Sequence, residues 1–153
     1  MILDVLRERI QCRFPLLFLT TWEEERWENE IASMSLDMDL GMVTWTSTEG
    51  ASPPIAENDN THLEPEEFLK QVRKYPKGTV FLLKDFHPYL DEPRVVRILR
   101  DLIPTLTEQQ KTILLMSPGV AIPVELRKDA ITIELPLPGI DELREELKEL
   151  LIR

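Results

Sequence analysis

The chain has 153 residues and a formal net charge of −10, a balance that disfavours binding to the phosphate backbone of nucleic acid and to anionic membrane surfaces. Its one cysteine excludes an intramolecular disulfide bond and favours a cytoplasmic protein over a secreted one. Apolar residues make up 42% of the sequence without a run of membrane-spanning length, so we expect one domain over residues 1–153 with a sizeable core.

Segments typical of helices alternate with segments typical of strands along the chain. Apolar residues recur at helical spacing in the first segment, and the next apolar run has the length of a strand. Strands are expected at Phe14–Thr20, Met42–Thr46, Thr79–Leu83, Lys111–Met116 and Ala130–Leu135. Helices are expected at Ile2–Cys12, from Thr21 to Gly41, Glu64–Tyr75, Asp91–Thr107 and Ile140–Ile152, with a short helix or turn at Pro123–Lys128.

The residues after the first strand carry signals for the start of a helix. Thr20 or Thr21 can cap it, and Glu23 or Glu24 then completes a capping box. Trp27 belongs to the apolar stripe of this helix, so we expect it in the core.

Residues 49–61 are rich in proline, serine, asparagine and aspartate, which predicts a flexible surface loop. Elsewhere, five strands alternate with helices. This alternation predicts a three-layer α/β sandwich around a five-stranded, mainly parallel sheet.

Polar side chains follow two of the buried strands. Lys84 and Asp85 come directly after Thr79–Leu83, and Ser117 follows the next strand. Open α/β sheets bind ligands at the carboxyl ends of their strands, so these residues and His87 are candidates for a nucleotide or magnesium site. His87 can act as a base there. The alternatives are that Asp85 caps a helix or anchors a loop, and that His87 bonds to backbone.

Five segments, taken in order, carry a family resemblance. They are RFPLLFLTTWEEER, VFLLKDFHPYL, VVRILRDL, ILLMSPGVAIPVELRK and LPLPGIDELREEL. Together they resemble the N-terminal region of the hypothetical-chloroplast-reading-frame AAA ATPases of cyanobacteria and algal plastids. The resemblance implies a P-loop NTPase-like sheet of order 5-1-4-3-2, counting strands along the chain. It places Asp85 on the magnesium-binding strand and Ser117 at the polar sensor. It also implies a complete AAA module in the parent protein and, in algae, a location in the plastid stroma.

The phosphate-binding loop of that family is missing. Such a loop needs glycines, so that backbone N–H groups can approach phosphate, followed by lysine and serine or threonine. The turn at residues 20–26 reads TTWEEER, without glycine or lysine, and its three carboxylates lie where phosphate would bind. Asp85 is followed by Phe86, where AAA hydrolases generally have an acidic residue. Two histidines and one cysteine, widely spaced, make no zinc signature, and His62 has no evident partner.

Two groups of residues are candidates for a protein interface. Trp22 lies at the mouth of the sheet, next to charged residues. Arg97 and Arg100 are at i,i+3 spacing and either face a neighbouring subunit or pair on the surface with Asp101 and nearby carboxylates. By resemblance, Arg127 falls near residues that reach into a neighbour's site in AAA proteins. The predicted interface residues are Trp22, Glu23, Glu24, Arg26, Arg97, Arg100 and Arg127.

We therefore expect a non-catalytic AAA-like N-terminal domain that serves assembly, regulation or partner recognition for an AAA ATPase. Its partner would be another protein, the AAA module of the same chain or a second copy, and it would hold no cofactor and no metal. The alternative is a domain that binds Mg-ATP through Lys84, Asp85 and Ser117 at an atypical phosphate site.

Overall fold

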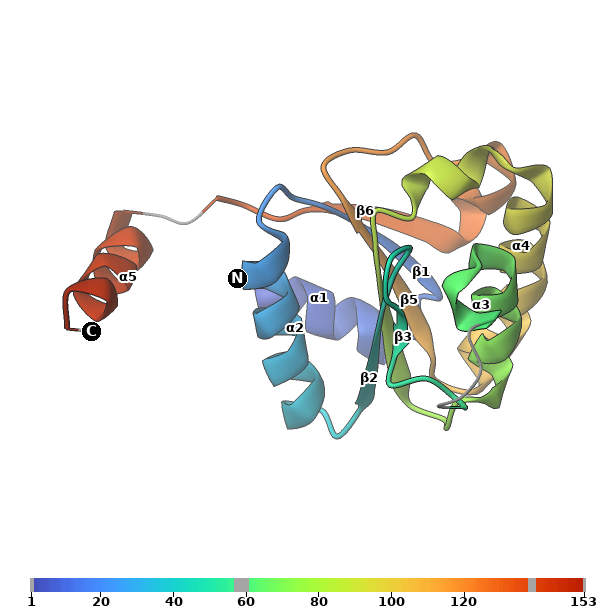
Figure 1. Cartoon of the computed structure of the whole chain (residues 1–153), viewed down its shortest axis with the longest axis horizontal. Coiled ribbons are helices and arrows are strands. Elements are labelled where there is room, and N and C mark those ends of the chain that lie inside the picture. The colour runs from blue at the N-terminus through green and yellow to red at the C-terminus, as the bar shows by residue number, and fades with distance from the viewer. Residues whose placement is uncertain (1, 57–60, 138–139, 153) are drawn as a thin grey trace.

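The computed structural model describes residues 2–56, 61–137 and 140–152, in which helices cover both faces of a six-stranded sheet (Figure 1). The strands are β1 (Leu16–Thr20), β2 (Gly41–Thr46), β3 (Gly50–Ser52), β4 (Thr79–Lys84), β5 (Thr112–Ser117) and β6 (Ala130–Glu134). Their order across the sheet is β3-β2-β4-β5-β1-β6, and every pair is parallel except β2 with β3.

This order confirms the predicted arrangement of the five long strands. The difference is β3, a three-residue edge strand that pairs antiparallel with β2. It lies inside the segment that the sequence predicted as a flexible loop, so that prediction is wrong for residues 50–52. Residues 57–60 of the same segment lie outside the described part of the chain.

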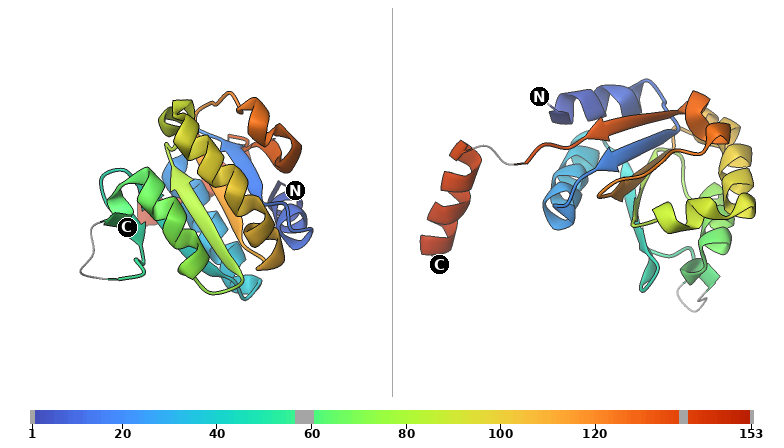
Figure 2. Two further views of the ribbon diagram at one scale, coloured as in Figure 1. Left: turned by 90° about the vertical axis from the view of Figure 1, so that its right-hand side faces the viewer. Right: turned by 90° about the horizontal axis from the view of Figure 1, so that it is seen from above.

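Helices cover both faces of the sheet (Figures 1 and 2). α1 (Ile2–Gln11) and α2 (Glu24–Asp37) pack on one face, and α3 (Pro65–Gln71) and α4 (Pro93–Glu108) pack on the other. Short 3₁₀ helices occupy the connections: η1 (Thr61–Leu63), η2 (Val72–Lys74), η3 (His87–Asp91) and η4 (Val124–Asp129). Among the described residues, no helix is both long and apolar enough to cross a membrane.

The central strands are apolar at successive positions because both of their faces are covered. In β4, Phe81 and Leu83 belong to the core under α3 and α4, whereas Val80 and Leu82 belong to the core under α1 and α2. Trp27 is buried on α2, as its place in the apolar stripe predicted.

The start of α2 differs from the predicted capping box. The helix begins at Glu24 and its N-cap residue is Glu23, which makes no side-chain capping hydrogen bond. Thr21 instead accepts a hydrogen bond from the Glu23 N–H through Oγ1 at 2.9 Å, outside the helix. At the other end, α2 stops at Asp37, and Gly41 is the first residue of β2.

The predicted boundaries of the other elements hold to within a few residues. Two differences are the largest. The last turn of the helix predicted over 64–75 is the 3₁₀ helix η2. The helix predicted from Asp91 begins at Pro93, because Asp91 belongs to η3 and Glu92 is the cap residue. Pro93 at the first position of α4 explains that start, because its missing N–H and fixed φ suit the first turn of a helix.

The last helix, α5 (Ile140–Ile152), lies apart from the sheet in Figure 1 and in the right-hand view of Figure 2. Its leucines Leu143, Leu147 and Leu150 form the stripe that the sequence predicted, and all three side chains are exposed. An amphipathic helix whose apolar stripe remains exposed is open to contact with another surface.

Candidate functional site

The carboxyl ends of β1, β4 and β5 meet at one edge of the sheet. Thr20 lies opposite Ser117, and the Asp85 N–H donates to the Met116 carbonyl at 2.9 Å. Asp85 has a left-handed backbone, with φ of 52°, and its side chain is exposed. The structure therefore brings Asp85 and Ser117 together, as the sequence predicted for strands that end side by side.

A small cavity lies at this edge. It has a volume of about 240 Å³ and is lined by Thr21, Trp22, Glu24, Asp85, Met116, Ser117 and Pro118. This is below the ~300–1,000 Å³ typical of small-molecule sites. Ser117 is buried, and its hydroxyl lies 3.4 Å from the Gly119 carbonyl, so it is not free to meet a ligand without moving.

Lys84 does not line that cavity but reaches to α2. Its Nζ donates to Glu28 Oε2 at 2.8 Å and lies 3.9 Å from Glu24 Oε1. The Lys84 and Glu28 side chains are only 17% and 27% exposed, so the ion pair is partly shielded from water. This pair joins the central strand β4 to α2, the helix that follows β1.

The turn between β1 and α2 is negatively charged, whereas a phosphate site is positively charged. Glu23, Glu24 and Glu25 occupy the start of α2, where their carboxylates interact favourably with the helix dipole. Glu23 Oε2 also accepts from Arg26 at 2.9 Å. With no glycine in the turn and carboxylates at the helix start, the site repels an anion.

The remaining candidate at this edge, His87, is not among the described residues that line the cavity. His87 is half-buried in η3, and its Nδ1 makes no hydrogen bond within the described part of the chain, contrary to the predicted backbone bond. Asp85 is not the N-cap of η3, whose cap residue is Phe86, so the helix-cap alternative for Asp85 is wrong. Over residues 2–56, 61–137 and 140–152, no three His, Cys, Asp or Glu side chains form a metal-binding group.

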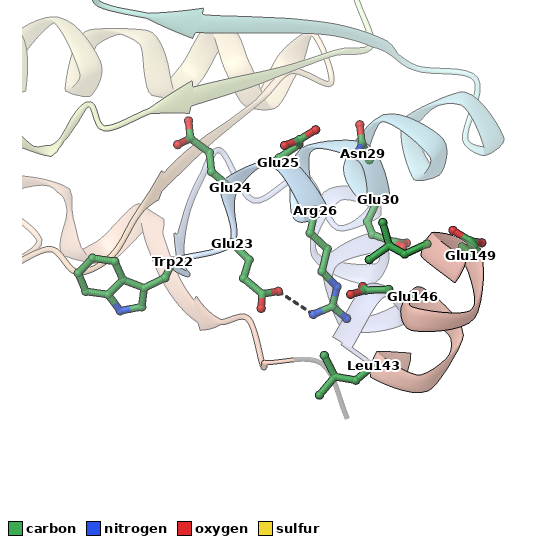
Figure 3. Close-up of a pocket in the computed structure, with 11 residues that line it drawn as sticks. Trp22, Glu23, Glu24, Glu25, Arg26, Asn29, Glu30, Leu143, Glu146 and Glu149 are labelled. Carbon is green, nitrogen blue, oxygen red and sulfur yellow. Dashed lines mark hydrogen bonds and ion pairs between the residues drawn. The ribbon is translucent and has the colours of Figure 1, made fainter. Parts of the chain in front are cut away.

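A much larger cleft lies on the other side of the α2 start, between α2 and α5 (Figure 3). Its volume is about 1030 Å³. Four predicted interface residues line it: Trp22, Glu23, Glu24 and Arg26. Arg26 projects from α2 and Glu146 from α5 into the space between the two helices.

The predicted arginine group lies elsewhere, on α4 and η4. Arg97 and Arg100 line a cavity of about 320 Å³ together with Glu125. Arg97 pairs with Asp101 at 2.7 Å, which bears out the surface-pairing alternative for this residue. Arg127 does not line this cavity, and its Nε donates to the Ile122 carbonyl at 3.3 Å.

Sequence reasoning missed the roles of two residues, one at the site and one in the core. Glu28 was not a predicted site residue. Its i,i+4 spacing from Glu24 places both carboxylates on one face of α2, but the sequence does not indicate that Lys84 is their partner. His62 is buried rather than unpartnered in a polar loop. Its Nδ1 accepts from the Ala51 N–H at 2.9 Å, and its carbonyl accepts from Trp45 Nε1 at 2.7 Å, so it fixes β3 to the core.

Comparison with known proteins gives one consistent family. The model for "SpoVK-like AAA ATPase, N-terminal domain" matches residues 2–135. The AAA domain-containing protein ycf46 of Guillardia theta is 31% identical over 141 residues, which are 90% of this chain and 28% of that protein. Its counterpart in Pyropia yezoensis is 30% identical over 146 residues, 93% of this chain and 30% of that protein. This chain therefore spans less than a third of the length of these relatives.

A solved structure agrees on the fold. Thermotoga maritima RuvB with the T158V substitution superposes with a TM-score of 0.56 over 97% of this chain and 49% of that chain, at 15% sequence identity. At that identity the likeness shows an AAA-like fold alone.

Proposed function

Because this chain belongs to the SpoVK-like AAA ATPase N-terminal domain family, we propose that it is a non-catalytic AAA-like domain that serves assembly, regulation or partner recognition in a longer AAA ATPase. The partial coverage of the ycf46 relatives supports a longer chain, and these relatives are AAA domain-containing proteins, which supports the AAA module. The proposed location is the cytoplasm or, in algae, the plastid stroma.

The Lys84–Glu28 ion pair is the observation that carries the non-catalytic assignment. In a phosphate site, a lysine would be free to meet the anion and the helix start would present bare N–H groups. Here the Lys84 ammonium is held by Glu28 at 2.8 Å, and three carboxylates occupy the helix start. A nucleotide would have to displace the lysine and approach these carboxylates with its own negative charge.

The second candidate function is nucleotide binding in an atypical pose. It is favoured by the shared cavity of Asp85 and Ser117 at the sheet edge. Its weakness is the cavity volume of about 240 Å³, which is too small for a nucleotide unless the β1–α2 turn moves.

The proposal assigns no resident cofactor or metal to the domain. The partner is a protein surface: another protein, the AAA module of the same chain or a second copy of the domain. Nucleic acid and membrane are not proposed as partners, because the net charge of −10 disfavours both.

A hydrolysis assay on the purified chain tests the proposal. We expect phosphate release from Mg-ATP to match a protein-free blank, in the wild type and in Asp85→Ala alike. Hydrolysis above the blank that disappears in Asp85→Ala would refute the non-catalytic assignment. Light scattering on the same sample, with and without nucleotide, would show whether the chain self-associates.

A further inference from the structure

Trp22 is the exposed tryptophan of this chain. Its side chain is 81% exposed, whereas Trp27 and Trp45 are buried. It stands in the turn before α2, at the cleft between α2 and α5. A large aromatic side chain left in water contributes little to folding, but aromatic residues are enriched at the centres of protein interfaces.

The α5 wall of the cleft also carries apolar side chains. Leu143 and Leu150 line it from α5, at 45% and 63% exposure. They are seven residues apart and so lie on the same side of the helix, two turns apart. Trp22 adds apolar surface at the end of the cleft next to the β1–α2 turn, with its ring directed away from α5 (Figure 3). Apolar side chains bordered by charged ones are what an amphipathic helix contacts in a groove.

The charges around these apolar residues have one dominant sign. Among the described residues that line the cleft, one is a cation, Arg26, and six are glutamates: Glu23, Glu24, Glu25, Glu30, Glu146 and Glu149. Arg26 is paired with Glu23 at 2.9 Å. Glu25 and Glu30 on α2 and Glu146 and Glu149 on α5 are exposed, and none of the four has an ion-pair partner within the described residues.

This charge pattern indicates which occupant the cleft fits. The carboxylates on α2 and α5 repel each other across the cleft, so closing α5 directly onto α2 is disfavoured. A cationic segment between the helices would pair with both walls. Lysine or arginine side chains also cover apolar surface with their methylene stems while their charged ends reach carboxylates.

We propose that the cleft between α2 and α5 binds a basic amphipathic helix of a partner protein, with its apolar face on Trp22, Leu143 and Leu150 and its cationic side chains on the glutamates. The cleft volume of about 1030 Å³ leaves room for such side chains between the walls. The inference rests on the proposed recognition function and specifies the chemistry of the partner.

Two synthetic peptides of about 16 residues test this proposal. Both carry leucines at positions i, i+3, i+4 and i+7; one carries lysines at its polar positions and the other carries glutamates. The measurement is acrylamide quenching of tryptophan fluorescence, in which Trp22 supplies the accessible component because Trp27 and Trp45 are buried. We expect the basic peptide to protect Trp22 from quenching, with an affinity that falls as salt rises, and the acidic peptide to have no effect.

Paired charge reversals locate the binding surface. E25K/E30K on α2 and E146K/E149K on α5 should each weaken the basic peptide at least about tenfold, because each removes favourable pairs and adds repulsion. The matched control, E108K/E125K, makes the same charge change on α4 and η4, away from the cleft, and should stay within about twofold of the wild type. Far-UV circular dichroism would show that each variant is folded.

Three results would overturn the inference: the basic peptide does not bind, the acidic peptide binds equally well, or both cleft variants bind like the wild type. Titrating the same samples with Mg-ATP separates this inference from the proposed function. Nucleotide binding would contradict the non-catalytic assignment. Absence of both nucleotide and peptide binding would overturn the cleft inference alone.

Discussion

The Lys84 ammonium lies 2.8 Å from a Glu28 carboxylate oxygen and ties the end of the central strand β4 to helix α2. Glu24 lies one helical turn before Glu28, with a carboxylate oxygen 3.9 Å from the same ammonium. A charge that a nucleotide-binding site would offer to phosphate is thus neutralised within the fold. The ion pair has a structural consequence that mutagenesis can measure.

Lys84→Met should lower the free energy of unfolding by about 1–2 kcal/mol, between the values for exposed and buried ion pairs. The loss arises because Glu28 keeps its partly shielded carboxylate without a partner. Urea unfolding followed by tryptophan fluorescence measures it. The matched control is Lys70→Met, which breaks the exposed Lys70–Glu67 pair and should cost below about 0.5 kcal/mol. Equal losses in the two variants would contradict a specific role for Lys84.

Gly50→Ala should destabilise the domain by about 1–3 kcal/mol, since it places a side chain on a left-handed residue. Gly50 has φ of 70°, and a Cβ there would clash with the His62 ring, which accepts a hydrogen bond from Ala51. Gly119→Ala is the control, because no atom of the described residues lies within 4 Å of a Cβ at that position. It should change stability by less than about 0.5 kcal/mol. Thermal denaturation measures both variants. If Gly50→Ala lowered stability as little as Gly119→Ala does, the described β3–η1 contact would be wrong.

The sequence predicted the framework well because the framework depends on local patterns. Five apolar runs of strand length, separated by helical periodicities, were enough to predict a parallel sheet with two covered faces. Its strand order came from the family resemblance rather than from the pattern. β3 was missed because its three residues, Gly50–Ser52, have no strand-like composition.

The site was less predictable because it depends on long-range pairs. Lys84 and Glu28 are 56 positions apart, and no local pattern links a strand end to one face of an earlier helix. The same holds for His62, whose polar neighbours suggested a surface loop while its ring is buried against β3. Trp22 was predicted as an interface residue at the mouth of the sheet, and its side chain is exposed.

Lys111 gives a prediction for the pH dependence of stability. Its side chain is buried, and its ammonium donates to the Val72 carbonyl at 3.0 Å and to Gln109 Oε1 at 2.6 Å. Burial lowers the pKa of Lys111 below its ordinary value of 10.5. Between the two pKa values the unfolded chain binds more protons than the folded chain, so the free energy of unfolding should rise with pH across that window.

Lys111→Met should remove this rise and cost about 1–3 kcal/mol at neutral pH by leaving buried carbonyls unpaired. The comparison is best made in a Tyr75→Phe background. Burial raises the pKa of Tyr75 above 10.0, so the unfolded phenol ionises first and stability falls as pH rises above that value. Urea unfolding from neutral to alkaline pH measures how the free energy of unfolding changes with pH, in Tyr75→Phe and in Tyr75→Phe with Lys111→Met. If the two proteins show the same change with pH, the assignment to Lys111 is wrong.

The most direct test of the central claim is calorimetric titration of the purified chain with Mg-ATP. The account predicts no binding heat at millimolar nucleotide, because Lys84 is held by Glu28 and the carboxylates at the start of α2 repel phosphate. It further predicts that E24Q/E28Q, which removes these charges and frees Lys84, binds at least as well as the wild type. Micromolar binding by the wild type that is lost in Asp85→Ala would contradict the account, since the edge of the sheet would then hold nucleotide without a phosphate-binding loop.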